Sequence, residues 1–317
     1  MKSVVFMGTP EFAVPSLESL IKSDDYDVIA VVTQPDKPVG RKHILTASPV
    51  KQTALKYNLP VLQPDKISNS SEMQQIIDMQ PDLIITAAFG QFLPDKLLQA
   101  VKIAAINIHA SLLPKYRGGA PIHYAVMNGD DKTGISIIYM VHKMDAGKII
   151  AQKSISITPE DDTGTMFEKL SILGKDLLLE TLPNLINGNI TPVEQDESQV
   201  IFSPNITRDQ EKIDFNKTAQ EIDYQVRGLR PFPGAYAVLN HQKTKLWDVQ
   251  PLLDVSTDQK PGFIVNLTKH TLDVAAGKGT VLRINQLQPS GKSKLRITDY
   301  INGNKFSIGD KLVDIDE

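Results

Sequence analysis

Two polar side chains lie near the end of an otherwise apolar stretch of the sequence. Asn107 and His109 alternate with Ile106 and Ile108, in a pattern that predicts a buried strand over residues 103–108. Successive side chains of a strand point to opposite faces, so the amide and the imidazole should leave this strand on one side. Because open α/β sheets bind ligands beyond the carboxyl ends of their strands, the pair marks a candidate site.

A carboxylate follows the next predicted strand of the chain. Asp145 lies in a hairpin-like connection after residues 135–141, two residues before Gly147. A carboxylate in this place can reach the His109 ring and hold one tautomer, as an acid supports histidine in hydrolase triads. Each residue alone also has a structural interpretation, because polar residues often cap strand ends and Asp before Gly favours a turn. Only the three side chains together, the amide, the imidazole and the carboxylate, predict a catalytic site.

The elements that must position these groups alternate between β-branched runs and helical patterns. Such alternation predicts an α/β domain with a Rossmann-like, doubly wound, mainly parallel sheet. The turn after the first strand, Gly8 to Phe12, has one of the glycines of a dinucleotide fingerprint, so a nicotinamide cofactor is not supported. The expected strands cover residues 3–7, 28–33, 83–87, 103–108 and 135–141, and the expected helices include 14–21, 49–57, 71–78, 121–127 and 165–185.

The pattern changes after about residue 198, where a polar stretch and a proline interrupt the chain. One further helix is expected over residues 218–228. Short strands separated by turn residues follow, as in a small β-barrel of the OB-like kind. We therefore expect two domains, residues 1–205 and 206–317, with the barrel strands at 235–239, 245–249, 262–266, 271–275 and 281–286 and one short strand after them.

The composition is that of a globular protein without metal or disulfide. There is no cysteine, and the six histidines have no ligand-like spacing. No apolar run is long enough to span a bilayer and the first residues lack a secretory signal, so we expect a cytoplasmic protein. The net charge is −3, yet residues 260–311 hold nine basic and three acidic side chains. This basic stretch is either a phosphate-binding face or a solvated, lysine-rich surface.

Three separated motifs resemble the active-site signature of the folate-dependent formyltransferases. They are Asn107-x-His109-x-Ser111-Leu112-Leu113-Pro114, then Tyr116-Arg117-Gly118, then Met144-Asp145-x-Gly147. The resemblance implies that 10-formyltetrahydrofolate donates the formyl group, that no metal takes part, and that Asn107, His109 and Asp145 are catalytic. It further implies a folate pocket formed by Ser111, Leu112, Leu113 and Pro114 with the backbone around Phe89, Gly90, Gln91 and Phe92.

Features outside these motifs resemble the branch of the family that acts on methionyl-tRNA. Residues 34–51 look like a basic loop inserted after an early strand to engage the acceptor stem, although a basic, proline-rich loop can also be a simple linker. Gly228 to Ala235 resembles the interdomain signature of that branch, and residues 262–292 resemble its barrel. The implied acceptor is initiator methionyl-tRNA, with Arg41 and Lys42 as tRNA contacts and Phe12 near the methionine. We expect a monomer with no membrane association.

In the mechanism that this resemblance implies, Asn107 and His109 donate hydrogen bonds to the oxyanion of a tetrahedral adduct. Asp145 supports His109 and serves in proton transfer. Two alternatives stay open: a sugar-nucleotide or other amine formyltransferase with the same donor, and a non-catalytic RNA-binding protein that uses the barrel. An acceptor assay separates the first, and folate binding separates the second.

Overall fold

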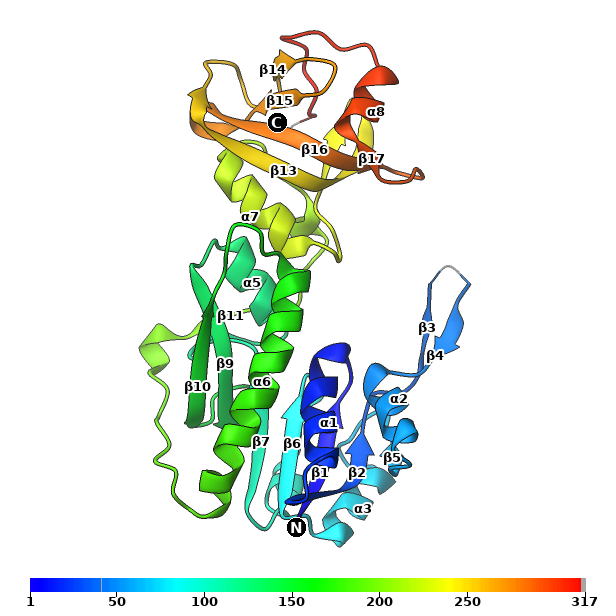
Figure 1. Cartoon of the computed structure of the whole chain (residues 1–317), viewed down its shortest axis with the longest axis vertical. Helices are drawn as coiled ribbons and strands as arrows, with labels where there is room; N and C mark the ends of the chain where they lie inside the picture. The colour runs from blue at the N-terminus through cyan, green and yellow to red at the C-terminus, as the bar shows by residue number, and fades with distance from the viewer. Residues whose placement is uncertain (41, 315–317) are drawn as a thin grey trace. The chain divides into compact units, whose positions relative to one another are not determined.

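A computed structural model describes residues 1–40 and 42–314, and they form two compact units. The first contains residues 1–121, 132–156 and 167–204; the second contains residues 122–131, 157–166 and 205–317. Figure 1 shows the course of the chain. No helix in the described part of the chain is long and apolar enough to cross a membrane.

A seven-stranded sheet forms the centre of the first unit, in the order β10-β9-β7-β6-β1-β2-β5. The five strands from β7 to β5 run parallel, whereas β9 and β10 are antiparallel to their neighbours, so the predicted mainly parallel α/β sheet is confirmed. The strand bounds are β1 Lys2–Gly8, β2 Tyr26–Val32, β5 Val61–Leu62, β6 Leu83–Ala87, β7 Ala104–His109, β9 Lys132–Tyr139 and β10 Ile149–Ser156.

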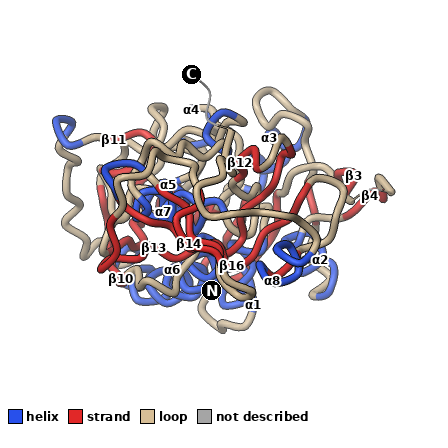
Figure 2. The backbone as a smooth tube through the Cα atoms, turned by 90° about the horizontal axis from the view of Figure 1, so that it is seen from above, coloured by secondary structure: helices blue, strands red, loops and turns tan. Residues whose placement is uncertain are grey.

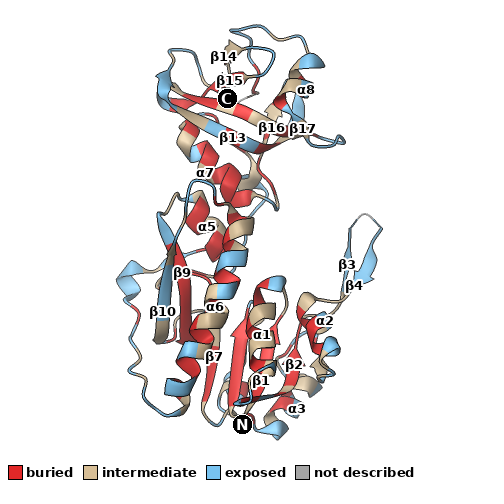
Figure 3. Cartoon of the chain, viewed as in Figure 1, coloured by how far each residue is buried: buried red, intermediate tan, exposed pale blue. Residues whose placement is uncertain are grey.

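The core strands are apolar on both faces because helices cover them. All five residues of β6 and the last five of β1 are buried (Figure 3). The accompanying helices are α1 Val14–Ile21, α2 Pro49–Lys56, α3 Ser71–Met79, α4 Asp95–Leu98 and α6 Thr163–Ile186, the last of which has residues in both units. Strand β10 was not predicted, since as an edge strand it mixes exposed Gln152 and Lys153 into its apolar residues.

The strand order changes direction between β1 and β6. From β1 the chain continues to β2 and β5 on one side, and then returns to β6 and β7 on the other. In open α/β sheets a ligand crevice forms at such a switch point, beyond the carboxyl ends of the strands. Gly8 at the end of β1 pairs with Ala87 at the end of β6, so the following loops start side by side.

The segment expected as a basic loop contains a short hairpin. Strands β3 (Lys37–Val39) and β4 (Ile44–Thr46) pair antiparallel and are exposed along their length. The hairpin projects from the body of the unit in both Figure 1 and Figure 2. Arg41 lies outside the described residues.

The second unit is an antiparallel β domain with strand order β12-β13-β16-β15-β14, and β17 pairs with β16. Residues 311 and 313 bridge Phe263 and Leu239 at the two edges, which closes the sheet toward a barrel. A capping box of Thr218 and Glu221 starts α7. The bounds are α5 Pro121–Met127, α7 Ala219–Leu229, β12 Tyr236–Leu239, β13 Gln242–Ser256, β14 Ile264–Leu267, β15 Leu272–Ala275, β16 Thr280–Pro289, β17 Leu295–Arg296 and α8 Ile297–Asn302.

Candidate active site

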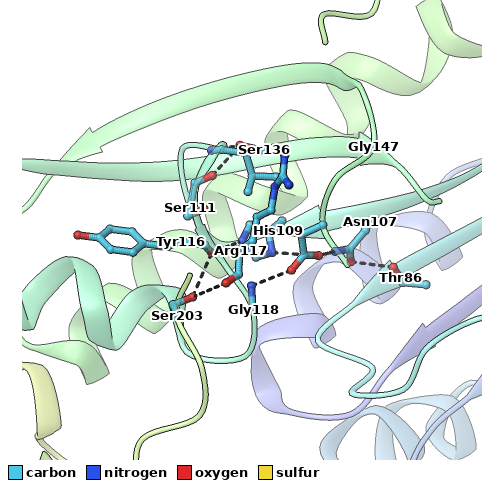
Figure 4. Close-up of polar contacts among 12 residues, drawn as sticks. Thr86, Asn107, His109, Ser111, Tyr116, Arg117, Gly118, Ser136, Gly147 and Ser203 are labelled. Atoms are coloured by element: carbon cyan, nitrogen blue, oxygen red, sulfur yellow. Dashed lines mark hydrogen bonds and ion pairs between the residues drawn. The ribbon is translucent and has the colours of Figure 1, made fainter. Parts of the chain in front are cut away.

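Asn107 and His109 lie in the second half of β7, two residues apart, so their side chains leave the strand on the same face, as the alternation predicts. Asn107 is opposite Thr86 of β6, whose hydroxyl donates to the amide oxygen Oδ1 over 2.7 Å. The amide nitrogen Nδ2 lies 3.4 Å from Oδ1 of Asp145. Because a carboxylate only accepts hydrogen bonds, this contact determines which end of the amide faces Asp145. Figure 4 shows the hydrogen bond between Thr86 and Asn107.

Asp145 lies in the connection between β9 and β10 and meets both residues of β7. Its Oδ1 is 3.6 Å from Nδ1 of His109, and its Oδ2 accepts the backbone N–H of Gly118 over 2.9 Å. The side chain is 14% exposed, so the carboxylate is largely enclosed by protein. Its backbone has φ of 50°, in the left-handed region that Asp tolerates better than most residues.

Both ring nitrogens of His109 face protein groups. Nε2 lies 2.9 Å from the carbonyl oxygen of Tyr116, and a carbonyl only accepts, so Nε2 carries a proton. Nδ1 faces the Asp145 carboxylate, and the ring is buried at 5% exposure. At 3.6 Å, Nδ1 and the carboxylate oxygen are neighbours but are too far apart for a hydrogen bond. The Tyr116 carbonyl and Asp145 thus fix the orientation of the ring, and the hydrogen bond from His109 to an oxyanion stays a prediction.

Glycines allow the surrounding backbone to approach the carboxylate. Gly118 has φ of 125°, and a Cβ on it would lie 2.7 Å from the carbonyl oxygen of Ser203. A Cβ on Gly147 would lie 1.7 Å from the carbonyl oxygen of Tyr139. Any side chain at either position would push the backbone away from Asp145.

A buried polar cluster lies behind the Asp145 turn and was not predicted. Arg117 is fully buried, and its Nε and Nη2 donate to Oε1 of Gln195 over 3.0 and 2.9 Å. Nη2 also pairs with Oε1 of Glu197 at 2.8 Å. Hydrogen bonds from Arg117 and then Lys143 lower the pKa of Glu197 to about 2. In the sequence Gln195 and Glu197 belong to a polar stretch typical of a linker, so no local pattern indicated their role.

Hydrogen bonds fix the Ser111 to Pro114 segment to β9. The Ser111 hydroxyl donates to the carbonyl of Lys115 over 2.6 Å, and the Ser136 hydroxyl donates to the Ser111 carbonyl over 2.6 Å. Ser111 and Leu113 are buried, whereas Leu112 and Pro114 are partly exposed. The Ser111 side chain is thus engaged within the protein, and Leu112 and Pro114 are the surfaces that remain for a ligand.

The loop after β6 lies at the switch point of the sheet. Phe89 is buried in the core, but its carbonyl oxygen accepts from Thr9 Oγ1 and Gln34 Nε2. Gly90 is exposed with φ of 82°, and Phe92 is 63% exposed. The Gln91 side chain instead holds the 64–67 loop, accepting from the N–H of Ile67 and donating to the carbonyls of residues 64 and 65.

The residues expected to contact the acceptor are Phe12, Arg41 and Lys42. Phe12 is buried at 5% exposure and packs edge-on against Phe167, with ring centroids 6.3 Å apart. Lys42 is exposed in the connection between β3 and β4 of the hairpin, and Arg41 is not described. Lys51, counted among the basic residues of this segment, pairs with Asp36 at 2.7 Å. Among the described residues no group of His, Cys, Asp or Glu could hold a metal ion.

The chain matches known proteins over nearly its whole length. Residues 1–182 match the family model described as formyl transferase, and residues 205–305 match the model of its C-terminal domain. Curated relatives named methionyl-tRNA formyltransferase include one from Lactiplantibacillus plantarum, 64% identical over 99% of both chains. Another is from Enterococcus faecalis, 59% identical over 98% of this chain and 99% of the relative.

More distant solved structures share the fold. An N-formyltransferase from Helicobacter canadensis, solved with folinic acid and dTDP-3-aminofucose, has a TM-score of 0.67 at 19% identity and covers 91% of this chain and 100% of its own. HypX from Aquifex aeolicus, solved with tetrahydrofolic acid, has a TM-score of 0.59 at 16% identity and covers 96% of this chain and 47% of its own. From the two family models and the full-length relatives, this chain belongs to the formyl transferase family.

Proposed function

We propose that the chain transfers the formyl group of 10-formyltetrahydrofolate to the amino group of methionine on initiator tRNA. The observation that carries the choice of acceptor is the 64% identity to a methionyl-tRNA formyltransferase over 99% of both chains, β domain included. The sugar-acting relatives are below 25% identical and support the fold alone. The product is N-formylmethionyl-tRNA for translation initiation.

The reaction joins the amino nitrogen to the formyl carbon and breaks the bond between that carbon and the folate nitrogen. The amine attacks as the free base, and the formyl oxygen becomes an oxyanion in the tetrahedral adduct. One proton leaves the incoming nitrogen, and one proton reaches the departing folate nitrogen. The protein therefore has to stabilise the oxyanion and to move a proton, and no covalent intermediate with the protein is needed.

Asn107 stabilises the oxyanion in this proposal. One hydrogen of its Nδ2 faces Asp145, and the other is free to donate toward the site. Thr86 holds the amide oxygen, so the nitrogen cannot turn away without losing that bond. A well-placed donor of this kind stabilises the transition state by about 3–4 kcal/mol.

Asp145 accepts the proton of the attacking amine and returns it to the folate nitrogen, directly or through water. His109 supports this role, because its Nδ1 faces the carboxylate while the Tyr116 carbonyl holds Nε2. The Gly118 N–H binds the other carboxylate oxygen and keeps Oδ1 directed toward Asn107 and His109. Proton transfer thus takes place beside the donor that stabilises the oxyanion.

The folate donor binds beyond the ends of β1 and β6 in this proposal. The loops that follow these strands are joined by the hydrogen bond of Thr9 to the Phe89 carbonyl, and Gln34, which follows β2, donates to the same carbonyl. Exposed Gly90 and Phe92, together with partly exposed Leu112 and Pro114, supply the backbone and apolar surface that a pterin ring requires. Gln91 acts through the position of the loop, because its side chain is bound to residues 64–67.

For the acceptor, we assign tRNA phosphate contacts to the β3–β4 hairpin and the basic side chains of residues 260–311. Lys37 and Lys42 are exposed on the hairpin, whereas Lys51 is neutralised by Asp36. Arg41 and Phe12 keep their predicted roles toward the acceptor end and the methionine. We also propose a monomer that acts in the cytoplasm, where aminoacylated tRNA is made and used.

One acceptor assay tests the proposal. The purified chain is incubated with 10-formyltetrahydrofolate and either methionyl initiator tRNA, a mischarged initiator tRNA or a dTDP-amino sugar, and formylated product is measured. We expect efficient transfer to methionyl-tRNA alone. Transfer to the sugar nucleotide with none to the tRNA would establish the sugar alternative, and folate-independent tRNA binding without transfer would establish a non-catalytic RNA-binding protein.

A further inference from the structure

The turn that carries Asp145 has little backbone structure of its own to hold it. In the connection between β9 and β10, the backbone N–H groups of Tyr139, Met140 and Ala146 donate to the carbonyls of Lys148, Ala105 and Lys143, respectively. None of them involves the carbonyls of Asp145 or Gly147. Residues 141–144 are exposed, and Asp145 has a left-handed φ. Side chains from elsewhere must therefore hold the carboxylate in place.

Gln195 supplies this support. Its Nε2 donates to the carbonyl of Asp145 over 2.7 Å and to the carbonyl of Gly147 over 2.8 Å. Both hydrogens of the amide are thereby used, and the side chain is buried with 9% exposure. The two bonds span the turn and limit the rotation of the 145–146 and 147–148 peptide groups.

The chemistry of the partners requires glutamine at this position. Arg117 can only donate, so the end of the amide that faces it must be the oxygen. The two carbonyls of the turn can only accept, so the other end must be the NH₂ group. A glutamate would keep the Arg117 contact and lose both donors. An alanine would lose every contact.

Arg117 and Gly118 close this arrangement into a ring of contacts. The Arg117 side chain holds Gln195, which holds the Asp145 backbone, and the next backbone N–H, from Gly118, binds the Asp145 carboxylate. Glu197 adds an outer link, because its oxygens pair with Arg117 and with Lys143 of the same turn. Gln195 thus holds the backbone of Asp145, and the Gly118 N–H holds its carboxylate.

We propose that Gln195 is a positioning residue that sets the place and orientation of the Asp145 carboxylate. The inference rests on the proposed role of Asp145 in proton transfer. Gln195 lies between the two family matches, which end at residue 182 and begin at residue 205. With Gln195 in this role, the segment between the two matched domains completes the reaction site.

The test uses Gln195→Glu and Gln195→Ala in the full chain, with Gln199→Glu as the matched control. Gln199 is exposed four residues further on, and the control makes the same charge change. We expect both Gln195 variants to lower kcat about 10- to 100-fold, because a displacement of about 1 Å of a reacting group has an effect of this size. The KM values for donor and acceptor should change less than about threefold, and the control should match wild type.

A double-mutant comparison separates positioning from general destabilisation. If Gln195 acts through Asp145, then Gln195→Ala should lower the residual kcat of Asp145→Asn by less than about threefold. A full additional loss in that background would overturn the inference. Wild-type kcat in both Gln195 variants would overturn it as well.

A measurement that needs no substrate tests the positioning role even if methionyl-tRNA is not the acceptor. In glycine-labelled protein, the Gly118 amide proton should resonate downfield because it donates to the carboxylate. It should move upfield in both Gln195 variants, toward its position in Asp145→Ala, and stay unchanged in Gln199→Glu. An unchanged Gly118 resonance in the Gln195 variants would refute the positioning role. Wild-type inactivity on methionyl-tRNA, in contrast, would refute only the proposed function.

Discussion

Replacing Asp145 with asparagine keeps the volume of the side chain and removes its capacity to take a proton. The amide has two orientations in the observed site. With its nitrogen toward Gly118, two donors would oppose each other across the 2.9 Å contact. With its oxygen toward Gly118, that bond is kept and the nitrogen faces Asn107 at 3.4 Å and Nδ1 of His109 at 3.6 Å. The second orientation is favoured, although it places two NH₂ groups side by side.

The expected effect falls on the chemical step. General acid–base catalysis by a positioned group contributes about 10²- to 10⁴-fold, so kcat for Asp145→Asn should fall at least about a hundredfold, which corresponds to about 2.7 kcal/mol. Repulsion between the introduced NH₂ group and that of Asn107 should also move the Asn107 donor away from the oxyanion. Folate binding should be little changed, because the substitution keeps the volume of the side chain and the proposed pterin surface lies on Gly90, Phe92, Leu112 and Pro114.

Single-turnover transfer at saturating donor and acceptor measures this step, and donor binding is measured separately by fluorescence. Asp314→Asn is the matched control, since Asp314 also pairs with a histidine ring, that of His241 at 2.9 Å, and accepts that residue's backbone N–H. The control should keep wild-type kcat. A near-wild-type rate for Asp145→Asn would remove Asp145 from the mechanism, and an equal loss in the control would attribute the effect to stability.

Three further predictions concern the turn, the tRNA and the pH dependence of stability. Gly147→Ala should lower kcat more than about tenfold, because its Cβ would meet the Tyr139 carbonyl at 1.7 Å, whereas Gly188→Ala, with no atom within 4 Å of its Cβ, should keep the wild-type rate. Arg41→Ala should weaken transfer to methionyl-tRNA at low salt and reduce the slope of log affinity against log salt by about 1, measured at several salt concentrations; an unchanged slope would exclude a phosphate contact. Burial lowers the pKa of His123 below its usual 6.5, so the unfolded chain binds more protons there and stability should fall as the pH drops below about 6.5. Urea unfolding followed by the fluorescence of Trp247, the single tryptophan, should show this loss between pH 7 and 5, and His123→Phe should flatten it; an equally steep loss in that variant would assign the effect to other groups.

The sequence alone determined the features that depend on local patterns. Short β-branched, apolar runs between helical patterns predicted five of the seven strands of the first sheet, all but β5 and β10, and β6 was predicted at its observed bounds, Leu83–Ala87. Period two also predicted that Asn107 and His109 leave β7 together, because this depends only on the geometry of a single strand. The motifs around these residues then indicated the family.

Only the tertiary structure decided how the polar groups are paired. Whether His109 donates to a substrate or to the protein depends on the Tyr116 carbonyl, seven residues away across a turn. The support of Asp145 by Gln195 joins residues 50 positions apart, and a polar linker sequence carries no signal for such a contact. Hydrogen bonds between distant segments arise from the close approach of buried donors and acceptors, which only the packed chain determines.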